Sequence, residues 1–342
     1  MIPIKNIYYM LSYAFYELHK KGYQKVSTEE FDNIYELYAE ILILGINKQL
    51  KRGIEKSYIN HEEQLFTIRG KINITDSIIP FVDHKQVVCE FDEFSINSYK
   101  NRIIKTTLNH LLKQNIDKLR HKKLRKLLVY FVEVDLLDIH NINWNLRYDR
   151  NNQTYMMLIN ICYLVINSLL QESSEGIRKL MTLSEDNMPR LYEKFILEYY
   201  KREHPEIKVE ASYIPWQLDD GFDFMLPTMK SDITLSDENN TLIIDAKYYK
   251  HTLQEYYDKK TIHSNNLYQI FTYVKNKDTE LQDKEANVSG MLLYAKTDEE
   301  EYPDQTYTMS GNRIIVKTLD LNQEFSKIRE QLDGIVYEYF NI

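Results

Sequence analysis

One stretch of the chain, MKSDITLSDENNTLIIDAKYY at residues 229–249, constrains the fold more than any other. Its two short runs are rich in apolar and β-branched residues, and they flank SDENN, a cluster of turn formers. This pattern predicts an antiparallel hairpin whose turn is centred on Glu238 and Asn239. With the turn centred there, Asp232 on the first strand lies directly opposite Asp245 on the second.

Two opposed carboxylates on one face of a hairpin are unfavourable. Directly opposed residues have Cβ atoms about 4.5–5.5 Å apart, and like charges at that separation destabilise the pair. Lys247 shares a face with Asp245, because side chains alternate along a strand. One face of the hairpin therefore carries two carboxylates and an ammonium group, a combination that requires a cation. Mg²⁺, which takes oxygen ligands, meets this requirement with Asp232 and Asp245 as ligands and the carbonyl of Ala246 as a further ligand.

A surface hairpin in which Lys247 pairs with one aspartate in solvent is the simpler interpretation. Two observations favour the metal site instead. Asp245 ends the apolar run LII, which is typical of a buried strand, and an isolated charge there would be costly without a partner. A divalent cation at this position can polarise a phosphodiester and lower the pKa of its bound water.

Composition bounds the class of protein. The chain has 342 residues, room for two domains, and two cysteines, too few for a disulfide framework or a zinc site. We expect a reducing, cytoplasmic location, because there is no secretory signal pattern and no apolar segment near the roughly 20 residues of a membrane helix. The net charge of −8 argues against bulk electrostatic coating of nucleic acid, but it does not exclude a metal-dependent nuclease.

Hydrophobic periodicity predicts an α+β N-terminal domain in residues 1–170. It combines helices with a small β element between Ile54 and Ile96, and the capping box Ser27–Glu30 is expected to start its second helix. The polar stretch Gln171–Gly176 is the predicted linker.

Residues 177–342 are predicted to form an α/β domain around a mixed central sheet. The pattern predicts, around the hairpin, helices near Met188–Glu203, Ser264–Lys275 and Asn322–Phe340 and strands at Val288–Lys296 and Asn312–Leu319.

The hairpin resembles the PD-(D/E)xK motif of restriction-endonuclease-like nucleases. Asp232 matches the first acid of that motif, and Asp245, Ala246 and Lys247 match its (D/E)xK element, whereas Ser231 replaces the proline. The resemblance implies a metal-dependent endodeoxyribonuclease, with Mg²⁺ replaceable by Mn²⁺, that cuts double-stranded DNA to leave 5′-phosphate and 3′-hydroxyl ends.

Two further elements extend the resemblance. Gln269 and Tyr273 in YQIFTY resemble the Q-x-x-x-Y element of some of these nucleases, and the alternative for them is an ordinary helix face. Glu193 in RLYEKFI lies where such nucleases often place another acid, although a solvated helix glutamate is the alternative.

Phrases from both halves of the chain resemble the McrC family, the nuclease subunits of methylcytosine-directed restriction systems. They are IPIKNIYYMLSYAF near the start, LKRGIEKSY at Leu50–Tyr58, LFTIRGKINI at Leu65–Ile74 and RLYEKFILEYY before the hairpin. The resemblance implies that the N-terminal domain docks on a McrB-like AAA+ GTPase ring and stimulates its GTPase. Arg52 and Arg69, each beside a glycine, are candidates for acting on that partner. RGKIN is not a Walker A loop, so no nucleotide is expected on this chain itself.

Two other functions stay open at this point. One is a stand-alone PD-(D/E)xK nuclease for DNA processing or repair, and the other is a non-catalytic adaptor that activates an AAA+ motor. A basic run, KLRHKKLRK at Lys118–Lys126, contacts phosphates or an acidic partner surface in one interpretation and is a solvated helix face in the other.

Overall fold

The computed structural model describes residues 2–19, 23, 26, 30–148, 152–175, 187–249, 253–256, 259–282, 286–296 and 302–340. Two compact units make up the chain: Met1–Glu30 together with Thr182–Ile342, and Phe31–Met181. Among the helices of the described ranges, none has the length and apolar character needed to cross a membrane.

Helix α1 (Ile4–Ala14) accounts for a difference from the predicted division, which assigned residues 1–170 to one N-terminal domain. This helix packs on α7 (Asn187–Glu203), within the unit that contains the hairpin. The Tyr13 hydroxyl, for example, donates to Glu203 Oε1 over 2.8 Å. The apolar face predicted for this helix is therefore buried within the unit that contains the hairpin.

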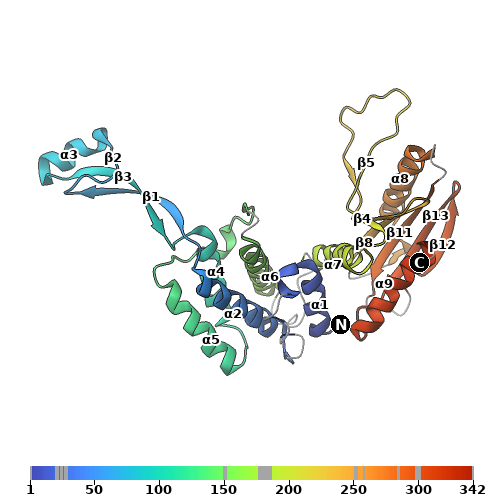
Figure 1. Ribbon diagram of the computed structural model, residues 1–342, viewed down its shortest axis with the longest axis horizontal. Helices are drawn as coiled ribbons and strands as arrows, with labels where there is room; N and C mark the ends of the chain where they lie inside the picture. Colours follow the sequence, from blue (N-terminus) through green and yellow to red (C-terminus); the bar gives the residue numbers. More distant parts are fainter. Residues whose placement is uncertain are drawn as a thin grey trace. The chain divides into compact units, whose positions relative to one another are not determined.

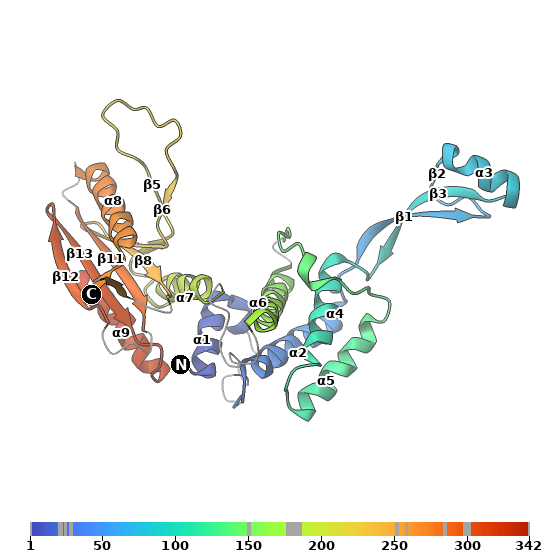
Figure 2. The ribbon, with the colours of Figure 1, turned by 180° about the vertical axis from the view of Figure 1, so that it is seen from behind.

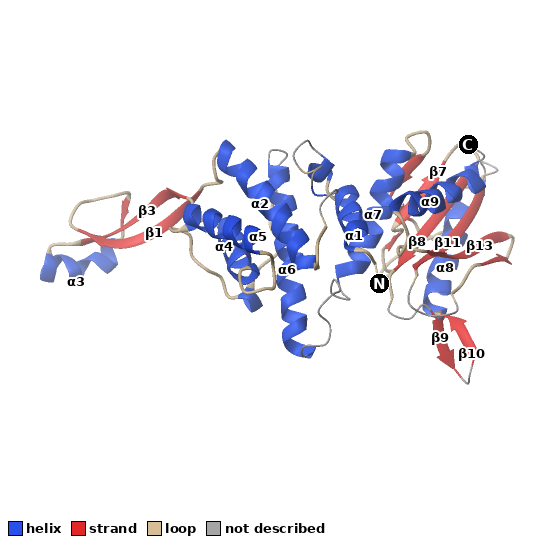
Figure 3. Ribbon diagram, turned by 90° about the horizontal axis from the view of Figure 1, so that it is seen from below, coloured by secondary structure: helices blue, strands red, loops and turns tan. Residues whose placement is uncertain are grey.

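The Phe31–Met181 unit is mainly helical (Figure 3). Its principal helices are α2 (Ile34–Arg52), α4 (Tyr99–Leu111), α5 (Lys118–Leu128) and α6 (Gln153–Glu175). Helix α2 begins after Asn33, whose side chain accepts hydrogen bonds from backbone N–H groups of the first turn. It does not begin at the expected capping box Ser27–Glu30, and Ser27 itself lies outside the described residues. The linker prediction was wrong for 171–175, because Gln and Glu are good helix formers and α6 continues through them.

The β element of this unit forms an arm that carries one helix, α3, at its tip (Figure 1). Its elements are β1 (Ser57–Leu65), β2 (Lys71–Ile72), α3 (Ile74–His84) and β3 (Val87–Ser95), with the strand order β1-β3-β2. The predicted small β element is present, but α3 interrupts it. Asn73 starts this helix by accepting a hydrogen bond from the backbone of Asp76, a capping signal that the strand interpretation overlooked.

A six-stranded mixed sheet forms the centre of the other unit, in the order β12-β13-β11-β8-β7-β4. Its strands are β4 (Lys208–Glu210), β7 (Ile233–Ser236), β8 (Asn240–Lys247), β11 (Asn287–Ala295), β12 (Gln305–Met309) and β13 (Asn312–Leu319). Strands β8, β11 and β13 are parallel to one another, and the remaining pairs are antiparallel. A mixed sheet in an α/β unit is what the sequence predicted.

Two short ribbons accompany this sheet: β5 (Tyr213–Ile214) with β6 (Met229–Lys230), and β9 (Leu253–Tyr256) with β10 (Lys259–Ile262). Figure 2 shows β5 and β6 leading into and out of a long loop, and β6 is followed directly by Ser231 and the hairpin.

Helix α8 (Ser264–Glu280) covers one face of the sheet, and α7 and α9 (Phe325–Phe340) lie on the opposite face (Figure 3). Ile270 and Val274 of α8 pack into a core with Ile243 and Leu292 of the central strands. Because side chains alternate along a strand, Asp245 and Lys247 share the α8 side with Ile243. The predicted catalytic side chains therefore lie on the α8 face of the sheet.

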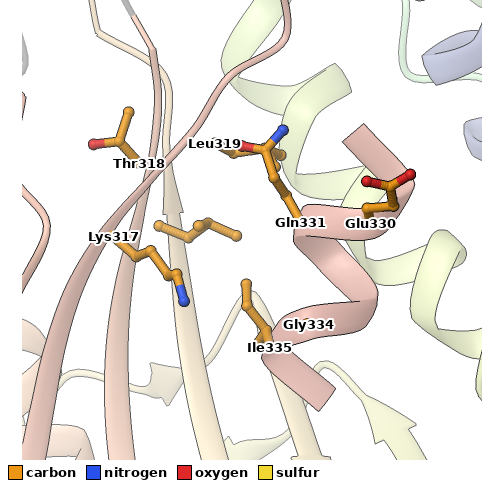
Figure 4. A pocket seen from close by; sticks show the side chains of 8 residues that line it. Lys317, Thr318, Leu319, Glu330, Gln331, Gly334 and Ile335 are labelled. Atoms are coloured by element: carbon orange, nitrogen blue, oxygen red, sulfur yellow. The ribbon is translucent and has the colours of Figure 1, made fainter. Parts of the chain in front are cut away.

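A cavity of about 250 Å³ lies on the α9 side, between β13 and α9 (Figure 4). Its lining includes Leu293, Lys317, Gln331, Gly334 and Ile335. Leu293 is paired with Ala246, one position beyond the pair of Leu292 with Asp245. The cavity is thus on the opposite side of the sheet from Asp245 and is separate from the site described below.

Close packing between α8 and the sheet predicts opposite effects for two glycine substitutions. A Cβ added to Gly290 would lie 2.6 Å from Val274 and 2.7 Å from Ile270, whereas a Cβ added to Gly334 of α9 meets nothing within 4 Å. We expect Gly290→Ala to cost about 1–3 kcal/mol through overpacking. Gly334→Ala should stabilise α9 by about 0.5–1 kcal/mol. Thermal unfolding followed by circular dichroism checks both, and an unchanged midpoint for Gly290→Ala would contradict the packing described.

Candidate active site

The hairpin has the predicted register. Ile233 pairs with Ile244 and Ser236 with Thr241, the pairing that places Asp232 opposite Asp245. The turn is held by Asp237, whose Oδ1 accepts hydrogen bonds from the backbone N–H groups of Asn239 and Asn240 over 2.8 and 2.6 Å. A turn of this kind leaves no freedom for the strands to slip by one residue.

Ser231 lies where the motif that the hairpin resembles has a proline. Its backbone N–H donates to Ser212 O over 3.0 Å, a hydrogen bond that proline cannot make. Its side chain is buried and lies 2.8 Å from the hydroxyl of Thr234. These contacts of its backbone and side chain hold Ser231, the residue directly before Asp232, in place.

Asp232 lies one position before β7 and is half-buried. Its Oδ2 accepts a hydrogen bond from the backbone N–H of Ala246 over 2.9 Å, which ties the two arms of the ribbon together. Burial and, after it, the charges of Asp245 and Glu193 raise the pKa of Asp232 to about 8, against the opposing effect of the Ala246 N–H and Lys247. At neutral pH this carboxyl therefore holds its proton in the absence of a cation.

Asp245 is 1% exposed and lies at the centre of the site. Lys247 Nζ is 2.9 Å from its Oδ2, but neither carboxylate oxygen accepts a hydrogen bond of normal geometry among the described residues. A buried carboxylate with unused lone pairs is unfavourable, since desolvation of the charge is not repaid by donors. These oxygens are available to a cation.

Lys247 connects the acids to α8. Burial alone would lower the pKa of Lys247, but the adjacent carboxylates of Asp245 and Asp232 outweigh it and raise the pKa above its ordinary value. Its Nζ is 3.4 Å from Gln269 Oε1, and Gln269 Nε2 donates to the hydroxyl of Tyr273 over 3.1 Å. The structure therefore brings the predicted Q-x-x-x-Y residues together with the lysine of the hairpin.

Glu193 approaches the site from α7. Burial raises the pKa of Glu193, Lys247 opposes the shift and Asp245 adds to it, so these charges lie within electrostatic reach of one another. Even so, no three His, Cys, Asp or Glu side chains in the described part of the chain form a cluster that could hold a metal ion. A carboxylate from Glu193 and the carbonyl of Ala246 as metal ligands stay predictions.

The donor set of the two aspartates fits a hard divalent cation. Mg²⁺ commonly uses one or two carboxylates and fills its other positions with water and substrate phosphate oxygens. The buried oxygens of Asp245 support this fit, because among the described residues neither accepts a hydrogen bond of normal geometry and both could coordinate a cation. A third carboxylate is not required for such a site.

Three residues beside Lys247 were missed by sequence reasoning. Tyr249 donates to Asn266 Oδ1 over 3.2 Å, and Asn266 Nδ2 donates to the hydroxyl of Tyr294 over 2.9 Å. Tyr294 pairs with Lys247 in the parallel register, and burial raises its pKa to about 12. Two of them could have been found from the sequence: Asn266 is three residues before Gln269 on α8, and Tyr294 places a polar hydroxyl inside the apolar run MLLYA.

Comparisons with known proteins agree with this architecture. A family model described as McrBC 5-methylcytosine restriction system component matches residues 4–295. The Escherichia coli K12 protein described as type IV methyl-directed restriction enzyme EcoKMcrBC is 28% identical over 347 aligned positions, covering 99% of this chain and 98% of its own length.

A solved structure shares the fold across both units. It is a half-complex from a tetradecameric assembly of Thermococcus gammatolerans McrB AAA+ hexamers with bound McrC. The TM-score is 0.51 at 16% identity, and the match covers 97% of this chain and 76% of the other.

The raised pKa of Asp232 predicts that removing its charge stabilises the metal-free protein. The carboxyl ionises near pH 4 in an unfolded chain, as aspartates ordinarily do at about 3.9, and near pH 8 in the folded protein. The folded state therefore loses stability as pH rises through that interval, and the loss is complete above it. Asp232→Asn keeps an acceptor for Ala246, so it should raise the unfolding midpoint by several degrees at about pH 9 and much less at about pH 4. Equal gains at both pH values in differential scanning calorimetry would contradict this assignment.

Proposed function

The chain belongs to the family of McrBC 5-methylcytosine restriction system components, and we propose that it is the endonuclease subunit of such a system. In this proposal a PD-(D/E)xK centre on the hairpin cuts double-stranded DNA with the help of Mg²⁺. A GTP-hydrolysing AAA+ partner of the McrB type activates the cutting, and this chain stimulates the GTPase of that partner.

The observation that carries the proposal is the charge arrangement of the β7–β8 ribbon. Asp232 and Asp245 come from opposite arms, and Lys247 Nζ lies 2.9 Å from Asp245 Oδ2. Among the described residues, neither Asp245 oxygen accepts a hydrogen bond of normal geometry. A structural ion pair would not need the second acid, and a solvated pair would not be buried. A centre that binds a cation and a phosphodiester accounts for all three features.

Asp232 and Asp245 would hold the Mg²⁺. When bound, the cation supplies Lewis acidity toward the phosphodiester and lowers the pKa of a coordinated water. Lys247 remains an ammonium group, because the neighbouring carboxylates raise its pKa. It therefore stabilises the negative charge that develops on the phosphate in the transition state and does not remove a proton from water. Gln269 and Tyr273 orient that ammonium through the hydrogen-bonded chain described above.

Docking on the AAA+ partner is proposed for the Phe31–Met181 unit. The tip of its arm exposes large apolar side chains, an arrangement that marks protein interaction surfaces. They include Phe66, Ile74, Ile78, Ile79, Phe81 and Val82. The related McrC, seen with McrB hexamers, supports a partner of this class.

The two candidate arginines differ in their surroundings. Arg52 ends α2 in an exposed position, whereas the Arg69 guanidinium lies 3.9 Å from the ring centroid of Phe91 on the arm. This stacking presents Arg69 in a fixed orientation on the arm, and we therefore favour Arg69 as the residue that acts on the partner.

Replacing Asp245 tests the proposed centre. Asp245→Asn preserves side-chain volume but removes the charge, so cutting in the reconstituted system should fall about 100-fold or more, as for loss of other transition-state electrostatic groups. Partner binding and GTPase stimulation should stay at the wild-type level. Asp237→Asn in the same hairpin is the matched control, because it retains the acceptor that the turn requires.

The outcomes of this experiment separate the three candidate functions. Cutting retained by Asp245→Asn would refute the proposed centre. Metal-dependent cutting by this chain alone, without GTP or a partner, would favour the stand-alone nuclease. No binding of Mn²⁺ in calorimetry, combined with full GTPase stimulation, would favour the non-catalytic adaptor.

Two tyrosines of α8 test the role of the helix. Tyr273→Phe removes the hydroxyl that accepts from Gln269, and losing one such hydrogen bond, worth about 1 kcal/mol, should slow cutting roughly fivefold with DNA affinity unchanged. Tyr268→Phe is the control, since Tyr268 is 68% exposed on the same helix. Single-turnover cleavage rates check the difference, and equal rates for the two variants would exclude an orienting role for the Gln269–Tyr273 pair.

A further inference from the structure

Helix α5 divides its basic residues into two groups. Arg120 and Lys123 lie on the side that faces α2, where Glu40 is 3.2 Å from each. Asp117, at the N-cap of α5, is 2.7 Å from Arg120. These two cations serve the fold, because they neutralise a glutamate whose side chain is only 5% exposed.

The other group points away from the unit. Lys118, Lys122, Arg125 and Lys126 are exposed, and at about 100° per residue they fall within one arc of roughly 100° on the helix surface. Within the described residues, no acidic side chain lies within ion-pair distance of any of them. The helix itself contains no acid, and Asp117 is already engaged by Arg120.

We propose that this outer face of α5, which we call the basic face, binds the phosphate backbone of double-stranded DNA. The proposal rests on the proposed function only for the identity of the polyanion. With a rise of about 1.5 Å per residue, the three lysines recur about every 6 Å along the helix. A DNA strand carries one charge per about 3.4 Å, so the basic face can engage several successive phosphates without reading sequence.

The residue types favour DNA over an acidic protein surface. Lysine is depleted in protein–protein interfaces relative to the rest of the surface, whereas arginine is enriched there. Three of the four cations on the basic face are lysines, whose flexible stems suit contacts with phosphates as point charges. In a chain of net charge −8, a local face of this kind is also what would hold DNA to the protein.

A matched pair of triple variants tests the basic face. Lys118→Gln, Lys122→Gln and Lys126→Gln remove three uncompensated charges. Lys201→Gln, Lys208→Gln and Lys327→Gln form the control, because each of these lysines is an exposed partner of a nearby glutamate. Both triple variants are made in the full chain and change its net charge equally. They differ only in the part of the surface from which the three positive charges are removed.

Binding to a short fluorescein-labelled DNA duplex is measured by anisotropy, with EDTA present, between about 50 and 200 mM salt. The basic-face variant should lose at least about tenfold in affinity at low salt, and the slope of log K against log salt should fall by about 2–3. The control variant should keep the wild-type slope. Equal slopes for both variants, or no DNA binding by the wild-type chain, would overturn the proposal.

Two further readouts make the result specific. If the basic-face variant keeps its DNA binding but loses binding to the AAA+ partner, the occupant is a protein and the proposal is wrong. Asp245→Asn should bind DNA with the wild-type slope, because it leaves α5 unchanged. Failure of the proposed function appears as retained cutting by Asp245→Asn, whereas failure of the basic face appears in the salt slope, and the two are therefore distinguishable.

Discussion

The register of one β-ribbon is the constraint on which the rest of the site depends. Ile233 and Leu235 of β7 and Ile244 of β8 are completely buried, and burial of each such side chain stabilises the fold by about 1.5–3 kcal/mol. A slip of one residue would turn these side chains to the wrong faces and move Asp245 to the α9 side of the sheet. Hydrophobic burial therefore holds Asp232 and Asp245 at a separation that their own charges oppose.

The same arrangement explains why the site is costly without a cation. A carboxylate in the interior normally receives donors from backbone or side chains, and Asp245 receives none of normal geometry from the described residues. Asp232 responds by holding its proton to about pH 8, which removes one negative charge from the cluster. Proteins commonly trade stability for function in this way, because groups arranged for chemistry are seldom arranged for folding. The apolar core beneath α8 provides the rigidity that keeps this unfavourable cluster in one geometry.

Local patterns predicted the hairpin and its register correctly, because their determinants are close in sequence. The alternation of apolar residues and the Asp237 turn set the pairing, and β13 has the predicted bounds of Asn312–Leu319. Long-range packing was not predictable in the same way. Periodicity shows that α1 has an apolar face, but it does not show that α7 covers this face. The Asn266–Tyr294 hydrogen bond likewise joins α8 to β11, and local sequence does not show that these two elements are in contact. The helix over 171–175 was missed because a polar stretch is compatible with both a linker and an exposed helix end.

Net charge is a poor guide to what this chain can bind, because charges act locally. At physiological salt the field of an exposed charge is screened within about 8 Å, so a surface is described by the neighbours of each charge and not by the total. On the inner side of α5, Glu40 pairs with Arg120 and Lys123, and Asp117 also pairs with Arg120. The exposed cations on the outer side have no acidic partner among the described residues. The hairpin shows the reverse case, in which two acids share a single lysine. Within the described residues, a chain with an overall excess of acids thus carries a cluster of cations on α5 and a pair of acidic side chains on the hairpin. The first suits a DNA phosphate as the proposed ligand, and the second suits a metal ion, which would displace the proton of Asp232.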